Sequence, residues 1–239
     1  MKNLIRSFLY EINKYIYSGN QFYCNICNKY YRKFFTAGEN RRPNARCPGC
    51  GAFERHRLMM YFLKDKTDFF SDNLSVLDIA PLQTFHKLFS KMENINYISI
   101  DMKLPYVTKR ADLTNLPFKD ESFDCIICYH VLEHIIDDNN AIREMYRVLK
   151  KGGWAIIQSP FDNSLEYSFE RQDIITKAER KKFYGQDDHV RIYGRDLIKR
   201  IEFSGFVVKE DDFIKKFSDK EIIKFALDKE EIINYCIKP

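Results

Sequence analysis

Short apolar runs alternate with helical patterns from Leu74 onward, and this alternation constrains the fold more than any other feature of the chain. Residues 75–80 (SVLDIA) and 123–129 (FDCIICY) are continuous apolar runs, as strands buried on both faces are. Residues 139–150 carry apolar side chains at the spacing of an amphipathic helix. Such alternation is typical of a parallel, doubly wound sheet, so we expect an α/β fold with helices on both faces.

A chain of 239 residues has room for one full α/β domain and a small second domain. Residues 160–193 are expected to form a long insertion before the last helix. The patterns predict helices at 1–18, 54–70, 82–92 and 195–204, and strands at 96–101, 110–113, 154–159, 206–211 and 232–237. We place the domain boundary after residue 60, with an N-terminal head over 1–60 and a larger body over 61–239.

Four cysteines of the head form two CxxC pairs, Cys24 with Cys27 and Cys47 with Cys50. Each pair can present two sulfurs to one metal ion at a tight turn, and two such turns complete a tetrahedral site. Thiolates also suit an iron–sulfur cluster, but this spacing favours structural Zn²⁺. The alternative is four ordinary or disulfide-bonded cysteines. The paired spacing predicts a small zinc-ribbon-like domain that the metal helps to fold.

Other features of the sequence indicate the cellular location of the chain. Seven cysteines without an export signal point to a reducing, cytoplasmic location. No stretch approaches the ~20 apolar residues of a membrane span. Cys125 and Cys128 repeat the CxxC spacing inside an apolar strand, where positions three apart face opposite sides, so we interpret them as core residues.

The head is basic, with eleven Lys and Arg residues against three Asp and Glu residues over 1–60. Arg41, Arg42 and Arg46 stand among aromatic residues, a pattern that can bind RNA through phosphates and stacked bases. Alternatively, the aromatic residues form the small core of the head and the charges its solvated surface. The run 54–57 (ERHR) opens a helix and either binds an anion or pairs with acids of the body.

Four segments in order resemble the class I S-adenosylmethionine-dependent methyltransferases, of the methyltransferase type 11 kind: VLDIAP, YISID, ADLTNLPFKDESFDCIICYHVLEHI and IREMYRVLKKGGWAIIQSP. The resemblance covers residues 74–237. It implies a Rossmann-like, mostly parallel sheet of seven strands whose last strand is antiparallel. It also implies S-adenosylmethionine as the cofactor, bound across the carboxyl ends of the strands.

The resemblance also implies roles for single residues. Asp101, followed by Met102, matches the acid that binds the ribose hydroxyls. Asp112 and the Leu113 amide match the loop that reads the adenine edge. The further matches are Asp78 and Ala80 of the first motif, near the methionine portion, and Tyr129 and His130, near the sulfonium. Glu133 and His134 are left open as supporting or surface residues.

The first motif departs from the family pattern. The family has Asp-x-Gly-x-Gly, whereas this chain has Asp78-Ile79-Ala80-Pro81-Leu82. A proline without an N–H and a bulky leucine alter the loop that approaches the cofactor. One alternative is therefore a non-catalytic binding module. A narrower resemblance, to bacterial zinc-bearing methyltransferases, lies in the head pattern CPxCG…RHR, the IAP motif and the segment GQDDHVRIYG.

The acceptor is expected to be a small molecule or a saccharide, with RNA as the alternative. Methyl transfer needs alignment of the acceptor and, for oxygen or nitrogen acceptors, a base near neutral pKa, which suits histidine. The catalytic candidates are His130 and His189, with Tyr193 as a contact to cofactor or substrate and Arg191 as a partner for an anionic acceptor. The segment 185–194 can instead be a structural loop network. The sequence does not predict an oligomeric state.

Overall fold

The computed structural model of the chain describes residues 2–38 and 41–239, without the side chains of residues 2–8. The chain divides into two compact units. The N-terminal unit comprises Met1–Ser71 and Asp212–Ile232, and the sheet unit comprises Asp72–Asp211 and Ile233–Pro239. The division therefore lies eleven residues beyond the predicted boundary, and a C-terminal segment joins the first unit.

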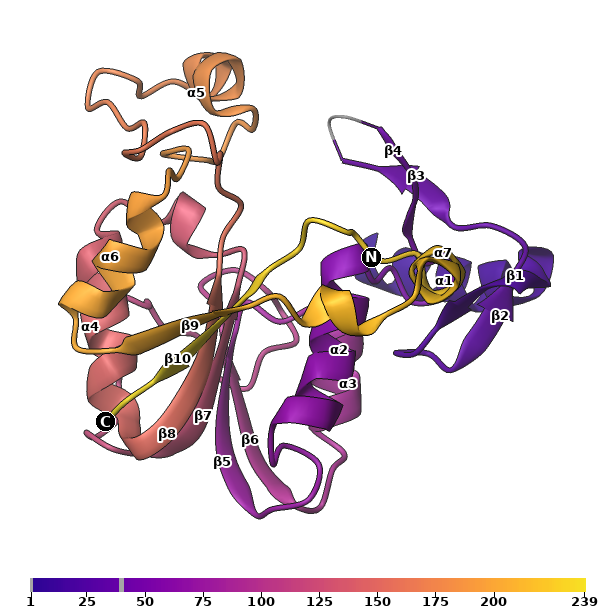
Figure 1. Ribbon diagram of the computed structural model, residues 1–239, viewed down its shortest axis with the longest axis horizontal. Helices are drawn as coiled ribbons and strands as arrows, with labels where there is room; N and C mark the ends of the chain where they lie inside the picture. The colour runs from indigo at the N-terminus through magenta and orange to yellow at the C-terminus, as the bar shows by residue number, and fades with distance from the viewer. Residues whose placement is uncertain (1, 39–40) are drawn as a thin grey trace. The chain divides into compact units, whose positions relative to one another are not determined.

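The sheet unit is built on a mixed sheet of six strands in the order β6-β5-β7-β8-β10-β9 (Figure 1). These strands are β5 Leu74–Ile79, β6 Ile95–Ile100, β7 Phe123–Tyr129, β8 Leu149–Gln158, β9 Val207–Asp211 and β10 Ile233–Ile237. The four strands β6, β5, β7 and β8 are parallel, and β10 runs antiparallel to both of its neighbours. This arrangement confirms the predicted α/β fold and the antiparallel last strand.

The predicted seventh strand near 110–113 does not form in the described part of the chain. Lys109 makes a single parallel bridge to Ile100 at the end of β6, and Asp112 bridges back to Asn115. The carboxylate of Asp112 accepts hydrogen bonds from the backbone and hydroxyl of Thr114, at 2.9 and 2.8 Å. This local turn competes with strand pairing, because the aspartate offers the backbone a nearer partner.

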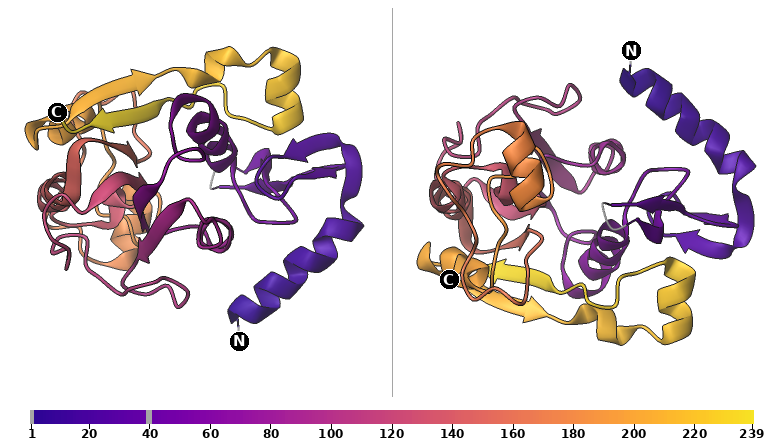
Figure 2. Two further views of the ribbon diagram at one scale, coloured as in Figure 1. Left: turned by 90° about the horizontal axis from the view of Figure 1, so that it is seen from below. Right: turned by 90° about the horizontal axis from the view of Figure 1, so that it is seen from above.

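Helices cover both faces of the sheet (Figures 1 and 2). Helices α4 Asp138–Val148 and α6 Asp196–Phe203 lie on one face, and α3 Gln83–Phe89 lies on the other. The main core lies under α4 and α6, where Leu77 and Ile79 of β5 meet the buried Ile142 and Met145. Residues of a strand alternate between faces, so Val76 and Asp78 turn to the side of α3.

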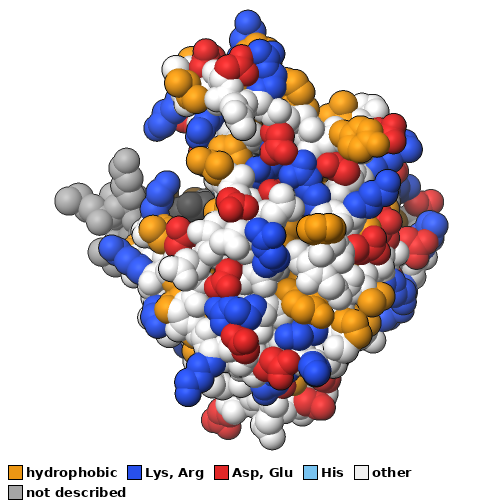
Figure 3. All heavy atoms as spheres, turned by 90° about the vertical axis from the view of Figure 1, so that its left-hand side faces the viewer, with side chains coloured by type: hydrophobic (Ala, Val, Ile, Leu, Met, Phe, Trp, Pro, Cys, Tyr) orange, Lys and Arg blue, Asp and Glu red, His pale blue; other side chains and the backbone are white. Residues whose placement is uncertain are grey.

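The insertion between β8 and α6 carries one helix, α5 Lys177–Tyr184. Two isolated bridges, Phe161 to Tyr193 and Phe169 to Ile192, fasten its ends together. The face of the molecule that carries α4, α5 and α6 mixes basic and acidic side chains (Figure 3). No helix in the described part of the chain is long and apolar enough to span a membrane.

The N-terminal unit consists of small hairpins and helices. Its elements are α1 Lys2–Ile16, β1 Ser18–Cys24, β2 Lys29–Tyr31, β3 Phe35–Ala37, β4 Arg42–Arg46, α2 Glu54–Lys66, η2 Phe213–Lys216 and α7 Asp219–Phe225. Strand β1 pairs with β2 and β3 with β4, both antiparallel. Helix α7 lies beside β1 (Figure 2), where the rings of Tyr23 and Phe225 are 6.0 Å apart.

Arg57 of α2 holds the C-terminal segment in the N-terminal unit. Its side chain is completely buried. The guanidinium donates to the carbonyl oxygens of Phe225 and Ala226, at 2.8 and 2.5 Å, and to those of Ala45 and Ala52, at 3.2 and 2.9 Å. One cation thus satisfies four buried carbonyls from three segments, and it cannot also bind an external anion, one of the roles considered for the run 54–57.

We predict that Arg57→Ala destabilises the chain by about 3 kcal/mol, because buried carbonyls lose charge-assisted hydrogen bonds. Urea unfolding of the full chain measures the change. Arg32→Ala removes an exposed arginine of the same unit and is the matched control. Equal unfolding midpoints for the two variants would contradict the role of Arg57.

Candidate functional site

The carboxyl ends of the four parallel strands meet at one edge of the sheet. Ile79, the last residue of β5, pairs with Ile100 of β6 and Cys128 of β7. The next residues, Ala80, Asp101 and Tyr129, therefore lie level on neighbouring strands that are ~4.8 Å apart. The chain passes from β5 to β6 on one side and returns to β7 on the other. A ligand of an open α/β sheet binds at such a switch point.

Two residues at this edge adopt the left-handed conformation that favours glycine. Ala80 has φ 51° and His130 has φ 59°. The Ala80 amide donates to the Ile100 carbonyl at 2.8 Å, and the His130 amide donates to the Gln158 carbonyl at 2.7 Å. Each conformation costs about 1 kcal/mol or more in a residue with a Cβ atom, and the neighbouring strands hold it in place. Ala80 thus occupies the first glycine position of the family motif with the backbone that a glycine there allows.

Asp101 and Asp112 both stand in turns beyond the strand ends. Oδ1 of Asp101 accepts the amides of Lys103 and Leu104 at 2.6 and 2.7 Å, which fixes the direction of the side chain. Asp101 is half-buried and Asp112 is exposed. In both residues these bonds go to Oδ1, so the chemistry of Oδ2 suits a hydroxyl or amino donor from a ligand. These acceptor oxygens fit the ribose and adenine contacts that the resemblance implies.

The neighbours of these carboxylates differ in exposure. Met102 follows Asp101 with 59% of its side chain exposed, whereas Leu113 follows Asp112 and is buried in the main core. A buried Leu113 side chain anchors the turn and leaves its backbone as the part that can meet a ligand.

Asp78 lies inside the sheet unit. It is 2% exposed, and Oδ2 accepts the hydroxyl of Tyr97 at 2.8 Å. Burial raises the pKa of Asp78 to about 7, although the hydrogen bond from Tyr97 acts in the opposite direction. The residue thus carries a carboxyl group whose charge changes near neutral pH, two residues before the left-handed Ala80.

His130, at the carboxyl end of β7, is oriented by a buried carboxylate. Its Nδ1 lies 3.3 Å from Oε1 of Glu133, and Oε2 of Glu133 accepts the Ser159 hydroxyl at 2.9 Å. Burial opposes ionisation of Glu133, but the hydrogen bond and charge of His130 outweigh it and lower the pKa of Glu133. The His130 ring stacks on that of Tyr129, 5.6 Å away. This carboxylate–imidazole pair is a suitable general base.

The other predicted catalytic residues lie in the segment that closes the insertion. Tyr193 is completely buried and donates to Oδ2 of Asp138 at 2.7 Å. Arg191 is 3% exposed and donates to the carbonyls of Leu132, Ile135 and Ile136 at 3.0, 2.5 and 2.8 Å. These contacts favour structural roles for both residues over contact with a substrate.

His189 lies beside residues that the sequence left open. Its ring meets that of His134 edge to face, with centroids 4.8 Å apart. The Val190 amide donates to the Glu133 carbonyl at 2.9 Å, so the end of the insertion is attached to the turn after β7. The sequence separates these residues by more than fifty positions. The only local sign of this group in the sequence is the adjacent pair Glu133 and His134, shortly after the end of a strand.

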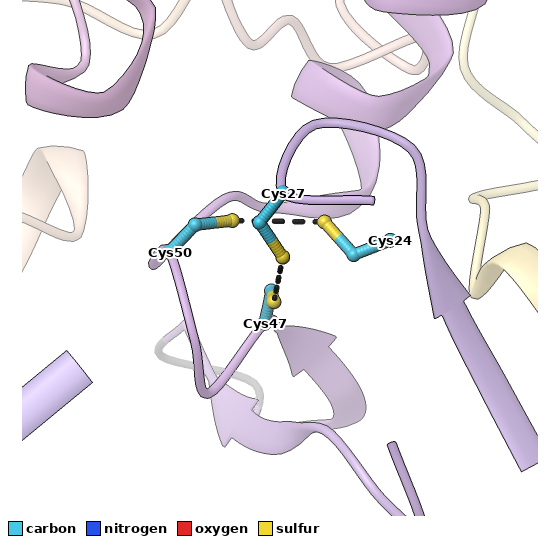
Figure 4. A group of neighbouring side chains, drawn as sticks. All are labelled: Cys24, Cys27, Cys47 and Cys50. Carbon is cyan, nitrogen blue, oxygen red and sulfur yellow. Dashed lines mark hydrogen bonds between the residues drawn. The ribbon is translucent and has the colours of Figure 1, made fainter. Parts of the chain in front are cut away.

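The four cysteines of the N-terminal unit converge on one point (Figure 4). The sulfurs of Cys24 and Cys50 are 3.6 Å apart, those of Cys27 and Cys47 are 3.7 Å apart, and all four lie within 4.8 Å of one another. These thiols are not joined as disulfides. Sulfurs ~2.3 Å from zinc in a tetrahedron are about 3.8 Å apart, so the spacing fits a tetrahedral thiolate site.

Comparisons with known proteins give relatives of part of the sheet unit. Residues 77–157 match the family described as a methyltransferase domain. The ubiquinone/menaquinone biosynthesis C-methyltransferase UbiE of Haemophilus ducreyi is 36% identical over 126 residues, which are 47% of this chain and 44% of that protein. UbiE of Pectobacterium atrosepticum is 39% identical over 66 residues, 28% of this chain and 22% of that protein. The chain thus spans less than half the length of these relatives.

Solved structures share the fold at low sequence identity. The [4+2]-cyclase SpnF is 14% identical with a TM-score of 0.50, and the match covers 87% of this chain and 86% of that chain. A putative methyltransferase from Bacillus halodurans is 18% identical with a TM-score of 0.48, covering 78% of this chain and 99% of that chain.

The fold is therefore that of a class I methyltransferase, with six strands in the described part of the chain. The matched domain and the fold together support an enzyme, an S-adenosylmethionine-dependent methyltransferase. A cyclase with the same fold shows that the fold alone does not define the reaction. The reaction must therefore be inferred from the residues of the site.

We predict that Asp78 makes the stability of the chain pH-dependent. The pKa is about 7 in the folded state and 3.8 for an unperturbed aspartate. Between these values the folded state keeps a proton that the unfolded state has released, so stability falls as pH rises. Asp78→Asn should therefore stabilise the chain more at pH 8 than at pH 4, which urea unfolding at both pH values measures. The exposed Asp120→Asn is the control, and a pH-independent difference would refute the assignment.

Proposed function

We propose that the chain transfers a methyl group from S-adenosylmethionine to a small polar acceptor, a small molecule or a saccharide. The observation that carries this proposal is the level row of Asp101, Ala80 and Tyr129 at the switch point of the sheet. A left-handed Ala80 in this row lets the backbone approach the cofactor as the family's glycine does. The non-catalytic alternative rests on Pro81 and Leu82 of the same loop, and it predicts that the chain does not bind S-adenosylmethionine.

Different residues at this edge bind different parts of the cofactor. Asp101 accepts hydrogen bonds from the ribose hydroxyls, and Asp112 with the Leu113 amide binds the adenine edge. When bound, the cofactor supplies an activated methyl group on a sulfonium. What the protein then adds is alignment of the acceptor with that group. Tyr129 and His130 lie at the end of β7, where such an acceptor would enter.

His130 is the proposed base. As the acceptor oxygen or nitrogen takes the methyl group, and the S–CH₃ bond breaks to leave the cofactor sulfur as a thioether, the His130 ring would accept the proton of the acceptor hydroxyl or amine. Glu133 orients the ring through the contact at 3.3 Å and stabilises its protonated form. Tyr193 and Arg191 position the surrounding segment, because their contacts lie with Asp138 and with backbone carbonyls.

The four-cysteine cluster is proposed to bind one structural Zn²⁺. Four thiolates this close repel one another unless a cation lies between them. The N-terminal unit has short hairpins, and a metal site of this kind supplies folding energy to such small units. Catalysis is assigned to the sheet unit alone.

RNA binding by the basic head finds less support. Arg42 donates to both carboxylate oxygens of Glu54 at 3.0 and 3.4 Å, and the guanidinium of Arg46 lies 5.7 Å from the Phe35 ring centroid. Arg57 is buried. Arg42 and Arg46 thus make contacts within the unit, whereas Arg41 is exposed, and we propose no second function.

We predict that Asp101→Ala weakens the binding of S-adenosylmethionine at least tenfold, because it removes the acceptor for the ribose hydroxyls. Calorimetric titration of the zinc-loaded chain measures the affinity. Asp120→Ala is the control, since Asp120 precedes β7 at the opposite edge of the sheet. Absence of saturable binding by the unaltered chain would overturn the proposed function.

We predict that Cys47→Ser lowers the zinc content by one ion per chain, because a hydroxyl is a poor fourth ligand beside three thiolates. Zinc content by mass spectrometry and resistance to limited proteolysis measure the effect. Cys125→Ala, in β7, removes a cysteine outside the cluster and should keep the zinc. Equal zinc content in the two variants would rule out the cluster as the binding site.

A further inference from the structure

Three potential metal ligands gather beside the carboxyl edge of the sheet, outside the four-cysteine cluster. They are a carboxylate oxygen of Glu133 and a ring nitrogen from each of His134 and His189, and these ligand atoms lie within 4.8 Å of one another. Glu133 and His134 belong to the turn η1 Leu132–His134 that follows β7, and His189 comes from the end of the insertion. All three residues lie in the sheet unit.

Contacts with neighbouring residues orient Glu133 and His134, and burial restricts His189. Glu133 is 2% exposed and is fixed by Ser159, while His189 is 6% exposed. Nδ1 of His134 lies 3.2 Å from the carbonyl oxygen of Asp188. A histidine that donates one ring N–H to a carbonyl keeps its other nitrogen as a lone-pair donor, which is the usual arrangement around metal-binding histidines.

The backbone fastens the two segments to each other. The Val190 amide donates to the Glu133 carbonyl, and the guanidinium of Arg191 binds three carbonyls from Leu132 to Ile136. A buried arginine and a backbone bond therefore set the distance between His189 and the turn. Metal binding requires that rotations of the side chains bring the donor nitrogens to the ~2.1 Å of a metal–nitrogen bond.

We propose that Glu133, His134 and His189 bind one divalent transition-metal ion beside His130. Two imidazoles and one carboxylate make a site for Mn²⁺, Fe²⁺, Co²⁺ or Zn²⁺, and three protein ligands leave coordination positions open. A carboxylate and nitrogen site accepts Mn²⁺, whereas a four-thiolate site prefers softer ions such as Zn²⁺. The four-thiolate site therefore favours Zn²⁺, whereas the second site can also bind Mn²⁺.

The position of the site suggests what the ion does. Oε1 of Glu133 is also the partner of His130, the proposed base. An ion held by Glu133 would thus lie next to the acceptor, where its open positions can bind a hydroxyl oxygen and lower the pKa of that hydroxyl. This step rests on the proposed function, and it indicates an acceptor with oxygen ligands, such as neighbouring hydroxyls.

Titration with Mn²⁺ tests the site without any methyl donor. The full chain with one equivalent of Zn²⁺, enough for the four-cysteine cluster alone, is titrated with MnCl₂, and electron paramagnetic resonance measures the signal of free aqueous Mn²⁺. We expect one saturable site per chain, and at least tenfold weaker binding in His189→Ala, His134→Ala and Glu133→Gln. His86→Ala, on α3, is the matched control and should bind Mn²⁺ as the unaltered chain does.

Absence of binding by the unaltered chain, or equal binding by His134→Ala and His86→Ala, overturns the proposal. His134 is the most exposed of the three ligands, so its variant remains informative if a variant of a buried ligand fails to fold. Binding of S-adenosylmethionine is measured separately. Retained Mn²⁺ binding with no cofactor binding would reject the proposed function and keep the metal site.

Discussion

Parallel pairing of β5, β6, β7 and β8 is the constraint on which the site depends. Parallel strands put all of their carboxyl ends at one edge, and the reversal of strand order between β5 and β7 opens that edge to a ligand. The register then places Ala80, Asp101 and Tyr129 side by side. Because the strands are fixed on both faces by helices, the strained turns at Ala80 and His130 can persist.

Buried charges connect segments that are far apart in the chain. Arg57 binds carbonyls of β4, of the loop at Ala52 and of the end of α7, and Arg191 binds the turn after β7. Each guanidinium offers five donors in a rigid plane, so one side chain can satisfy several backbone groups that would otherwise be buried without partners. The cost of burying these charges is offset by bonds to carbonyls. The same residues look like surface cations in the sequence.

Glu133 takes part both in the proposed general base and in the proposed second metal site. Its carboxylate contacts His130 and Ser159, and it belongs to the cluster with His134 and His189. A base oriented by this carboxylate and a metal held by it would act on the same acceptor. The site would then select acceptors that offer oxygen atoms to the ion and place a hydroxyl group beside His130. The two proposals together thus define the class of acceptor as well as the methyl donor.

The sequence by itself determined the elements whose causes are local. The CxxC pairs converge because each pair lies in a tight turn, and the strands follow from continuous apolar runs. The positions of Asp101, Ala80 and His130 follow from strand ends. The tertiary structure decided the rest. The turn at Asp112 replaced a seventh strand, Arg57 drew residues 212–232 into the first unit, and His189 met Glu133. Contacts between residues this far apart in the chain depend on packing, which no local pattern encodes.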